Sequence, residues 1–186
     1  MRDPKRVAIL ISGRGSNMRA LVDGARNYEV ALIASNKLQA AGLEWARDRG
    51  LPVWSLESKG TEREAYDRIL SVALDDRSVG TIALAGFMRI LSPWFVEEWR
   101  GRILNIHPSL LPKYRGLDTH VRAIDAGDTV SGCSVHIVTE ELDAGEVLGQ
   151  AEVQIERGDT PATLEQRVLS AEHRLYPQVL NQFVER

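Results

Sequence analysis

The sequence predicts an α/β fold: a mostly parallel, twisted sheet with helices on both faces and an antiparallel strand pair near the C-terminus. Short, continuously apolar runs such as Val7–Ile11 suit strands that are covered on both faces, and they alternate with helical patterns. Two further strand patterns, at 133–138 and 147–155, are joined by a short connection, which favours antiparallel pairing. Thr160 followed by Pro161 marks the start of a long final helix.

The first half of the chain contains the parallel part of the predicted sheet. We expect strands at 7–11, 30–34, 53–56 and 81–85, and helices near 18–26, 40–49 and 61–76. Gly50 and Pro52 end the second helix. The segment Thr61-Glu62-Arg63-Glu64 resembles a capping box and should open the third. Because strands that alternate with helices lie parallel, ligands should bind just beyond the carboxyl ends of these strands.

The second half of the chain changes character after a fifth strand at 103–107. Residues 108–116 contain two prolines and a glycine, which predicts a loop, and a short helix should follow near 120–126. The final helix should face the core with apolar residues at helical spacing: Leu164, Val168, Ala171, Leu175, Val179 and Phe183.

Length and composition limit the possible functions. The 186 residues suit a single domain, 1–186, and the net charge of −3 gives no overall attraction to nucleic acid or an acidic membrane. The apolar runs are too short to cross a bilayer. The lone Cys133 cannot form an intramolecular disulfide, which favours a reducing, cytoplasmic compartment. We expect small-molecule substrates and a monomer or homodimer.

A glycine-containing motif, Ser12-Gly-Arg-Gly-Ser-Asn17, connects the first strand to the first helix. Its glycines allow a tight turn that brings backbone amides close to an anion, and the helix N-terminus adds partial positive charge. Ser16 and Asn17 can add side-chain hydrogen bonds. The motif is neither the dinucleotide fingerprint nor the Walker A pattern. On these residues alone, a phosphate site and a plain turn capped by Ser16 are equally compatible with the sequence.

A polar pair, Asn105 and His107, interrupts the otherwise apolar fifth strand. Residues two apart on a strand share a face, and buried polar groups need partners. Histidine can exchange a proton near neutral pH, and an asparagine amide can donate to a developing oxyanion. A hydrogen-bonded structural histidine is the alternative, and the local pattern favours it narrowly.

An acidic segment, Thr139–Gly145, joins the last two strands. Its carboxylates are typical of a solvated hairpin, but one of them could orient His107 and favour its protonated form. Metal binding is not expected, because the chain has neither an H-E-x-x-H motif nor a cysteine cluster.

Residues 103–116, Ile-Leu-Asn-Ile-His-Pro-Ser-Leu-Leu-Pro-Lys-Tyr-Arg-Gly, closely resemble the signature of the folate-dependent formyltransferases. Ala85–Pro93, Glu141–Gly145, Gly13–Asn17 and Ala171–His173 also match, so the resemblance covers nearly the whole chain. The last two segments are similar to the branch that formylates glycinamide ribonucleotide. The resemblance implies a Rossmann-like formyltransferase fold. It also implies transfer from 10-formyltetrahydrofolate, as co-substrate, to the amine of 5-phosphoribosylglycinamide in de novo purine biosynthesis.

The resemblance also implies residue roles. Asn105, His107 and Asp143 match the catalytic residues, and Ser134 matches a supporting polar residue. The implied ribonucleotide contacts are Gly15, Ser16, Asn17 and Glu172. The implied folate contacts are Arg63, Met88, Arg89, Ile90, Leu91, Asn105, Thr139, Glu140, Glu141, Leu142 and Asp143. The half at about 1–100 would bind ribonucleotide phosphate, and the half at about 101–186 would carry the catalytic residues and much of the folate site. Leu169 replaces a polar ribose contact common in relatives.

Three other functions remain open. Formyltetrahydrofolate hydrolases usually add an N-terminal regulatory domain, whereas the strand pattern here begins at Val7. Methionyl-tRNA formyltransferases normally add a C-terminal RNA-binding domain, which we do not expect here. A non-enzymatic nucleotide-binding module would leave Asn105, His107 and the acidic loop unexplained.

Overall fold

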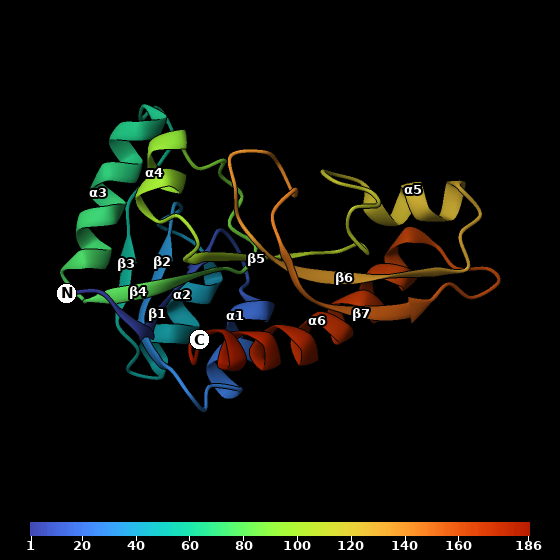
Figure 1. The fold of residues 1–186 in the computed structure, drawn as a ribbon, viewed down its shortest axis with the longest axis horizontal. Coiled ribbons are helices and arrows are strands. Elements are labelled where there is room, and N and C mark those ends of the chain that lie inside the picture. Colours follow the sequence, from blue (N-terminus) through green and yellow to red (C-terminus); the bar gives the residue numbers. More distant parts are fainter.

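The computed structural model describes residues 1–186 and contains one seven-stranded sheet (Figure 1). The strands are β1 (Asp3–Ile11), β2 (Glu29–Ser35), β3 (Val53–Ser55), β4 (Val79–Leu84), β5 (Ile103–His107), β6 (Val130–Ile137) and β7 (Val147–Gln154), in the order β3-β2-β1-β4-β5-β6-β7. The first five run parallel, whereas β6 is antiparallel to both β5 and β7. The predicted fold class is confirmed.

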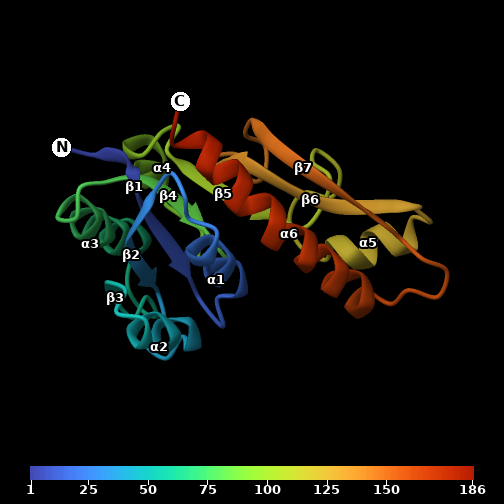
Figure 2. The ribbon, with the colours of Figure 1, turned by 90° about the horizontal axis from the view of Figure 1, so that it is seen from below.

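Helices cover both faces of this sheet. They are α1 (Ser16–Asp23), α2 (Ala41–Asp48), α3 (Arg63–Asp75), α4 (Pro93–Glu98), α5 (Thr119–Asp125) and α6 (Pro161–Phe183). Ile9 and Ile11 of β1 belong to an apolar cluster with α1, α2 and α6, whereas Ala8 and Leu10 belong to a second cluster with α3 and α4. This alternation is the two-residue period of a strand buried on both faces. Figure 2 shows α6 running along the sheet next to α1. No helix has the length and apolarity needed to span a bilayer.

Two local predictions need correction. The start of α3 is capped by Glu62 rather than Thr61, because the Glu62 carboxylate reaches the backbone N–H groups of Glu64 and Ala65. The short helix α4 was not predicted from the sequence, although Ser92 caps it and Pro93 opens it. With only six residues, α4 has too little periodicity to stand out.

The long helix α6 begins as predicted. Thr160 and Thr163 form a reciprocal capping box, and the six predicted core positions are buried or packed against the core. Just before the helix, Asp159 accepts hydrogen bonds from Arg167, from the Thr163 hydroxyl and from the Glu156 backbone N–H. These contacts, led by that of Arg167, lower the pKa of Asp159 to about 2.

Asp159→Asn should therefore lower the thermal midpoint at pH 7 by a few degrees. A carboxyl group with a lowered pKa stabilises the fold at pH values above its ordinary pKa near 3.8. This stabilisation is lost as the pH falls toward 2. Calorimetry of both proteins between pH 7 and pH 3 should show the difference shrinking below about pH 4. Asp125→Asn, at an exposed carboxylate without such partners, is the control. An equal difference at every pH would contradict this assignment.

Candidate active site

Polar side chains line one face of the β5–β6 pair. In the antiparallel register Asn105 stands opposite His136, and His107 stands opposite Ser134. The alternate residues of both strands, Leu104, Ile106, Cys133 and Val135, all belong to the apolar cluster beneath α6. The predicted shared face of Asn105 and His107 is thus found, and the opposite strand extends it. Cys133 is packed in the core, where burial raises the pKa of its thiol to about 12.

Asp143 reaches this polar face from the connection between β6 and β7. Its Oδ2 lies 3.4 Å from His107 Nδ1, and its Oδ1 lies 3.5 Å from His136 Nε2. The Gly116 backbone N–H donates to Oδ2 at 2.9 Å. Burial would raise the pKa of the Asp143 carboxyl, but His136, the Gly116 amide and His107 together lower it. Asp143 is therefore a buried carboxylate between two imidazoles.

Backbone geometry brings Asp143 to this position. Its φ is +50°, a left-handed conformation that few residues other than glycine, asparagine and aspartate adopt. Two residues later, a Cβ on Gly145 would stand 1.8 Å from the carbonyl oxygen of Ile137, so only glycine permits this approach to β6. The connection between β6 and β7 therefore folds back toward β5 and β6. It is not a wholly solvated hairpin, because the Asp143 side chain is only 8% exposed.

The loop after β5 contacts the second nitrogen of His107. His107 Nε2 lies 2.9 Å from the carbonyl oxygen of Tyr114, and the residue is only 6% exposed. Both ring nitrogens therefore face oxygen acceptors, Tyr114 on one side and Asp143 on the other. This arrangement suits the doubly protonated imidazole, in which both nitrogens are donors.

Ser134 anchors the same loop to β6. Its buried hydroxyl donates to the Ser109 carbonyl at 2.6 Å and accepts from the Leu111 backbone N–H at 3.0 Å. Gln150 of β7 donates to the Ser134 hydroxyl at 2.9 Å and to the Leu111 carbonyl at 3.0 Å. Sequence reasoning did not single out Gln150, since a polar residue on an edge strand is ordinarily solvated.

The glycine motif lies at the carboxyl end of β1 and meets α6 there. Gly15 is the N-cap residue of α1 at φ +72°, and no side chain caps this helix, so Ser16 is not a cap. Asn17 Nδ2 donates to Glu172 Oε2 at 2.7 Å, and both side chains are buried. Burial raises the pKa of Glu172, and the Asn17 hydrogen bond opposes that rise. Two predicted ribonucleotide residues, 155 positions apart, are thus in direct contact.

Ser12 links the glycine motif to the segment after β4. Its hydroxyl donates to Asn36 Oδ1 at 2.5 Å and accepts from the Met88 backbone N–H at 2.7 Å. The sequence pattern alone assigns no role to Ser12. Met88 is 71% exposed and Ile90 is 67% exposed, whereas Leu91 is buried. The segment therefore presents apolar side chains to the surface beside the motif.

Arg89 joins this segment to the start of α3. Its guanidinium lies 3.4 Å from the carbonyl oxygens of Thr61 and Glu62, and 4.7 Å from the centre of the Tyr66 ring. Arg63 is exposed at the first position of α3, next to Glu62. The two predicted folate arginines therefore belong to neighbouring segments.

The remaining predicted folate residues lie on the exposed part of the acidic loop. Thr139 donates to the Glu141 carbonyl at 3.0 Å, and the Glu141 carboxylate pairs with Arg115 at 2.6 Å. Glu140 and Leu142 are exposed. Of this loop, only Asp143 reaches the histidines.

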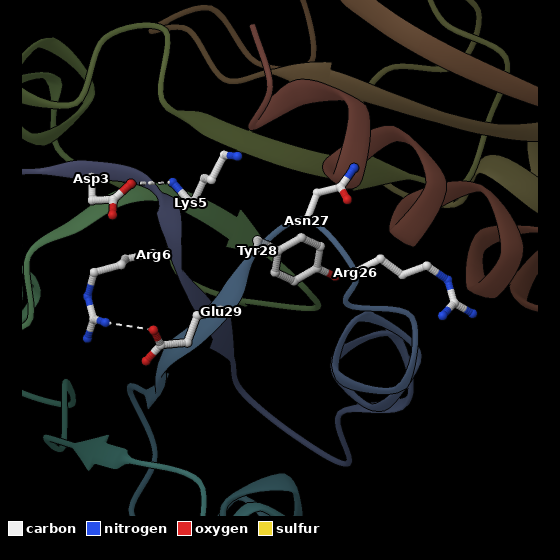
Figure 3. Close-up of a pocket in the computed structure, with 7 residues that line it drawn as sticks. All are labelled: Asp3, Lys5, Arg6, Arg26, Asn27, Tyr28 and Glu29. Carbon is white, nitrogen blue, oxygen red and sulfur yellow. Dashed lines mark hydrogen bonds and ion pairs between the residues drawn. The ribbon is translucent and has the colours of Figure 1, made fainter.

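A separate hollow of about 420 Å³ lies at the amino ends of β1 and β2 (Figure 3). Its lining residues are Asp3, Lys5, Arg6, Arg26, Asn27, Tyr28 and Glu29, and Arg6 pairs with Glu29 at 2.8 Å. None of the predicted site residues lines it. It lies at the other end of the strands from the glycine motif.

The sequence and the fold are similar to those of known proteins. The model of the family described as "Formyl transferase" matches residues 5–180. The chain belongs to the formyl transferase family. No group of three or more side chains that could hold a metal ion is present in this formyltransferase.

Individual relatives are similar along nearly the whole formyltransferase chain. The phosphoribosylglycinamide formyltransferase of Escherichia coli (strain K12) is 46% identical over 184 residues, covering 96% of this chain and 87% of the relative. The human trifunctional purine biosynthetic protein adenosine-3 is 45% identical over 180 residues, but the chain spans only 18% of that protein. The crystal structure of phosphoribosylglycinamide formyltransferase from Brucella melitensis superposes with a TM-score of 0.92 at 46% identity, covering 100% of this chain and 97% of that one.

Proposed function

We propose that this formyltransferase moves the formyl group of 10-formyltetrahydrofolate to the amine of 5-phosphoribosylglycinamide, as a step of de novo purine biosynthesis. The observation that carries the proposal is the meeting of Asn105, His107 and Asp143 on one face of β5 and β6. The names of the relatives described above support the choice of acceptor.

In the proposed mechanism the glycinamide nitrogen attacks the formyl carbon, and a tetrahedral oxyanion forms. The Asn105 amide and the protonated His107 imidazole stabilise that charge, as preorganised donors do in acyl transfer. The attacking nitrogen then loses a proton and the folate nitrogen gains one, with His107 as the proposed relay. The folate leaves with the electrons of the broken carbon–nitrogen bond. Asp143 favours the protonated ring of His107 and orients it, and no covalent enzyme intermediate is required.

The ribonucleotide half of the proposed site is formed by Gly15, Ser16, Asn17 and Glu172. Backbone N–H groups at the start of α1 would bind the phosphate. Asn17 Oδ1 is buried without a hydrogen-bond partner, and Glu172 is a buried carboxyl beside it. Such acceptors suit the hydroxyl groups of a ribose.

The folate half of the proposed site would combine the segment after β4, the start of α3 and the acidic loop. The exposed apolar side chains of Met88, Ile90 and Leu142 suit contact with an aromatic heterocycle. Arg63 and Arg89 supply positive charge for carboxylates. This half is completed by Leu91 and by the backbone of Thr139, Glu140 and Glu141. Ser134 would support the catalytic residues by anchoring the loop after β5.

The proposed roles are divided between the N-terminal and C-terminal halves of the chain. Residues at about 1–100 would bind the ribonucleotide phosphate, and residues at about 101–186 would carry the catalytic groups and much of the folate site. We propose that the enzyme acts on these small molecules in the cytoplasm, as a monomer or a homodimer, and not on nucleic acid or at a membrane.

One assay tests the proposed function. The purified protein is incubated with 10-formyltetrahydrofolate, with and without the ribonucleotide, and release of tetrahydrofolate is followed. Release that requires the ribonucleotide is the expected result. Release without it would indicate a hydrolase, and no release in either case would contradict formyl transfer to this acceptor.

Glu172→Ala should raise the KM for the ribonucleotide by about 10–100-fold, because a hydrogen bond to a charged group contributes about 1.5–3 kcal/mol. The KM for the folate should stay within about 3-fold, because Glu172 belongs to the ribonucleotide half alone. Steady-state kinetics with each substrate varied in turn measure both values. Glu185→Ala, an exposed carboxylate just beyond α6, is the control. A selective loss of folate affinity would contradict the assignment of the two halves.

A further inference from the structure

His136 is a buried histidine that the proposed mechanism does not use. It is 2% exposed, stands directly opposite Asn105 in the β5–β6 register, and has partners on both ring nitrogens. Nδ1 lies 2.9 Å from the carbonyl oxygen of Ile137, and Nε2 lies 3.2 Å from Asn105 Nδ2. A purely structural histidine on a strand needs no contact with a catalytic amide.

The partners determine where the ring proton lies. A carbonyl oxygen only accepts, so Nδ1, which faces Ile137, must carry a hydrogen. In the neutral ring Nε2 then has a free lone pair, and it accepts a hydrogen bond from an N–H. The neighbouring Asn105 must present its NH₂ group to Nε2. If its amide oxygen faced Nε2 instead, two hydrogen-bond acceptors would oppose each other.

Nε2 of His136 has two polar neighbours, Asn105 Nδ2 at 3.2 Å and Asp143 Oδ1 at 3.5 Å. Asp143 also lies 3.4 Å from His107 and accepts from the Gly116 backbone N–H at 2.9 Å. The Asn105 amide is therefore the nearer partner of Nε2. The neutral ring with its hydrogen on Nδ1 is the form in which Nε2 can accept from that amide.

We propose that His136 is a positioning residue for Asn105, fixing its amide so that one N–H is held by Nε2 and the other is free for the reaction centre. Without this acceptor the amide could rotate and turn its oxygen toward the developing oxyanion, which would repel it. The inference rests on the proposed function, because it names what holds the oxyanion donor of that same site.

The tautomer is measurable on the wild-type protein without any substrate. Long-range ¹H–¹⁵N spectra of protein labelled with ¹⁵N-histidine distinguish a protonated from an unprotonated Nε2, and His136→Gln assigns the signal. We expect an unprotonated Nε2 at the pH of the assay. A protonated Nε2 would overturn the proposal, and this readout stands even if formyl transfer is not found, so the two failures are distinguishable.

Turnover of paired variants tests the positioning role. His136→Leu removes the acceptor, and kcat should fall by about 10–100-fold, less than the 10²–10³-fold that losing an oxyanion donor costs. Both KM values should change by less than about 3-fold, as expected when only transition-state contacts are lost. His136→Gln keeps a carbonyl oxygen that can accept from Asn105, and kcat should stay within about 10-fold of wild type.

A double-mutant cycle separates positioning from general damage to the fold. In the His136→Leu background, Asn105→Ala should cost far less than it does in the wild type, because the amide is already misaligned. Additive losses, or a glutamine variant as impaired as the leucine variant, would overturn the proposal. Circular dichroism and thermal midpoints of all variants confirm that folded proteins are compared.

Discussion

Replacing His107 with alanine should lower kcat by about 10²–10⁴-fold, the range that general acid–base groups contribute. The chain should still fold, because the hydrogen bonds that join Ser109 and Leu111 of the loop after β5 to Ser134 do not involve the His107 ring. Removing the ring takes away the imidazole between Tyr114 and Asp143. With it would go the proposed positive charge that stabilises the oxyanion and the proposed group that moves a proton to the leaving nitrogen.

His107→Gln separates the two contributions of the ring. Glutamine keeps a hydrogen-bond donor but does not exchange protons near neutral pH, so its kcat should also fall by at least about 10²-fold. Stopped-flow measurement of tetrahydrofolate release in both variants gives these values. Near-normal turnover in either folded variant would contradict a proton-transfer role.

The second large effect is expected for Asp143→Asn. Because we propose that Asp143 acts through His107, kcat should fall by about 10²-fold or more, but not beyond the loss in His107→Ala. Asparagine tolerates the left-handed backbone at φ +50° and can still accept from the Gly116 amide. The loop should therefore keep its conformation while the negative charge is lost.

The pH dependence of the Asp143→Asn variant should also change. In the wild type the lowered pKa of the Asp143 carboxyl keeps it ionised through the neutral range, and its support of His107 is lost only as pH falls below about 4. Asparagine does not titrate, so the fall in rate expected of the wild type below about pH 4 should be absent from the variant. Glu146→Gln, an exposed carboxylate in the same connection, is the control. An unshifted profile with an unchanged kcat would contradict the role of Asp143.

Much of the scaffold could be predicted because its signals are local. Continuous apolarity identified the buried strands, and the two-residue period of β5 predicted that Asn105 and His107 share a face. Thr160 and Pro161 predicted the start of α6, since both cap and first-turn proline act on the adjacent backbone. These features depend on neighbouring residues and not on tertiary contacts.

The rest of the site depends on contacts between distant segments. Asp143 reaches His107 only because Gly145 packs against the backbone of β6, and the acidic loop alone is equally typical of a solvated hairpin. The partner of His107 Nε2 is the backbone carbonyl of Tyr114, which no sequence pattern reveals. His136 is hydrogen-bonded on its strand, and the partner that its Nε2 finds, Asn105, lies on a different strand 31 positions away.

The fate of the formyl group tests the central claim most directly. With isotopically labelled formyl on the folate and one equivalent each of enzyme and ribonucleotide, the products of a single turnover can be separated and identified by mass spectrometry. We predict that the label is found on the glycinamide nitrogen of the ribonucleotide, in equal amount to the tetrahydrofolate released. Label recovered as free formate, or retained on the folate, would contradict direct transfer by this site.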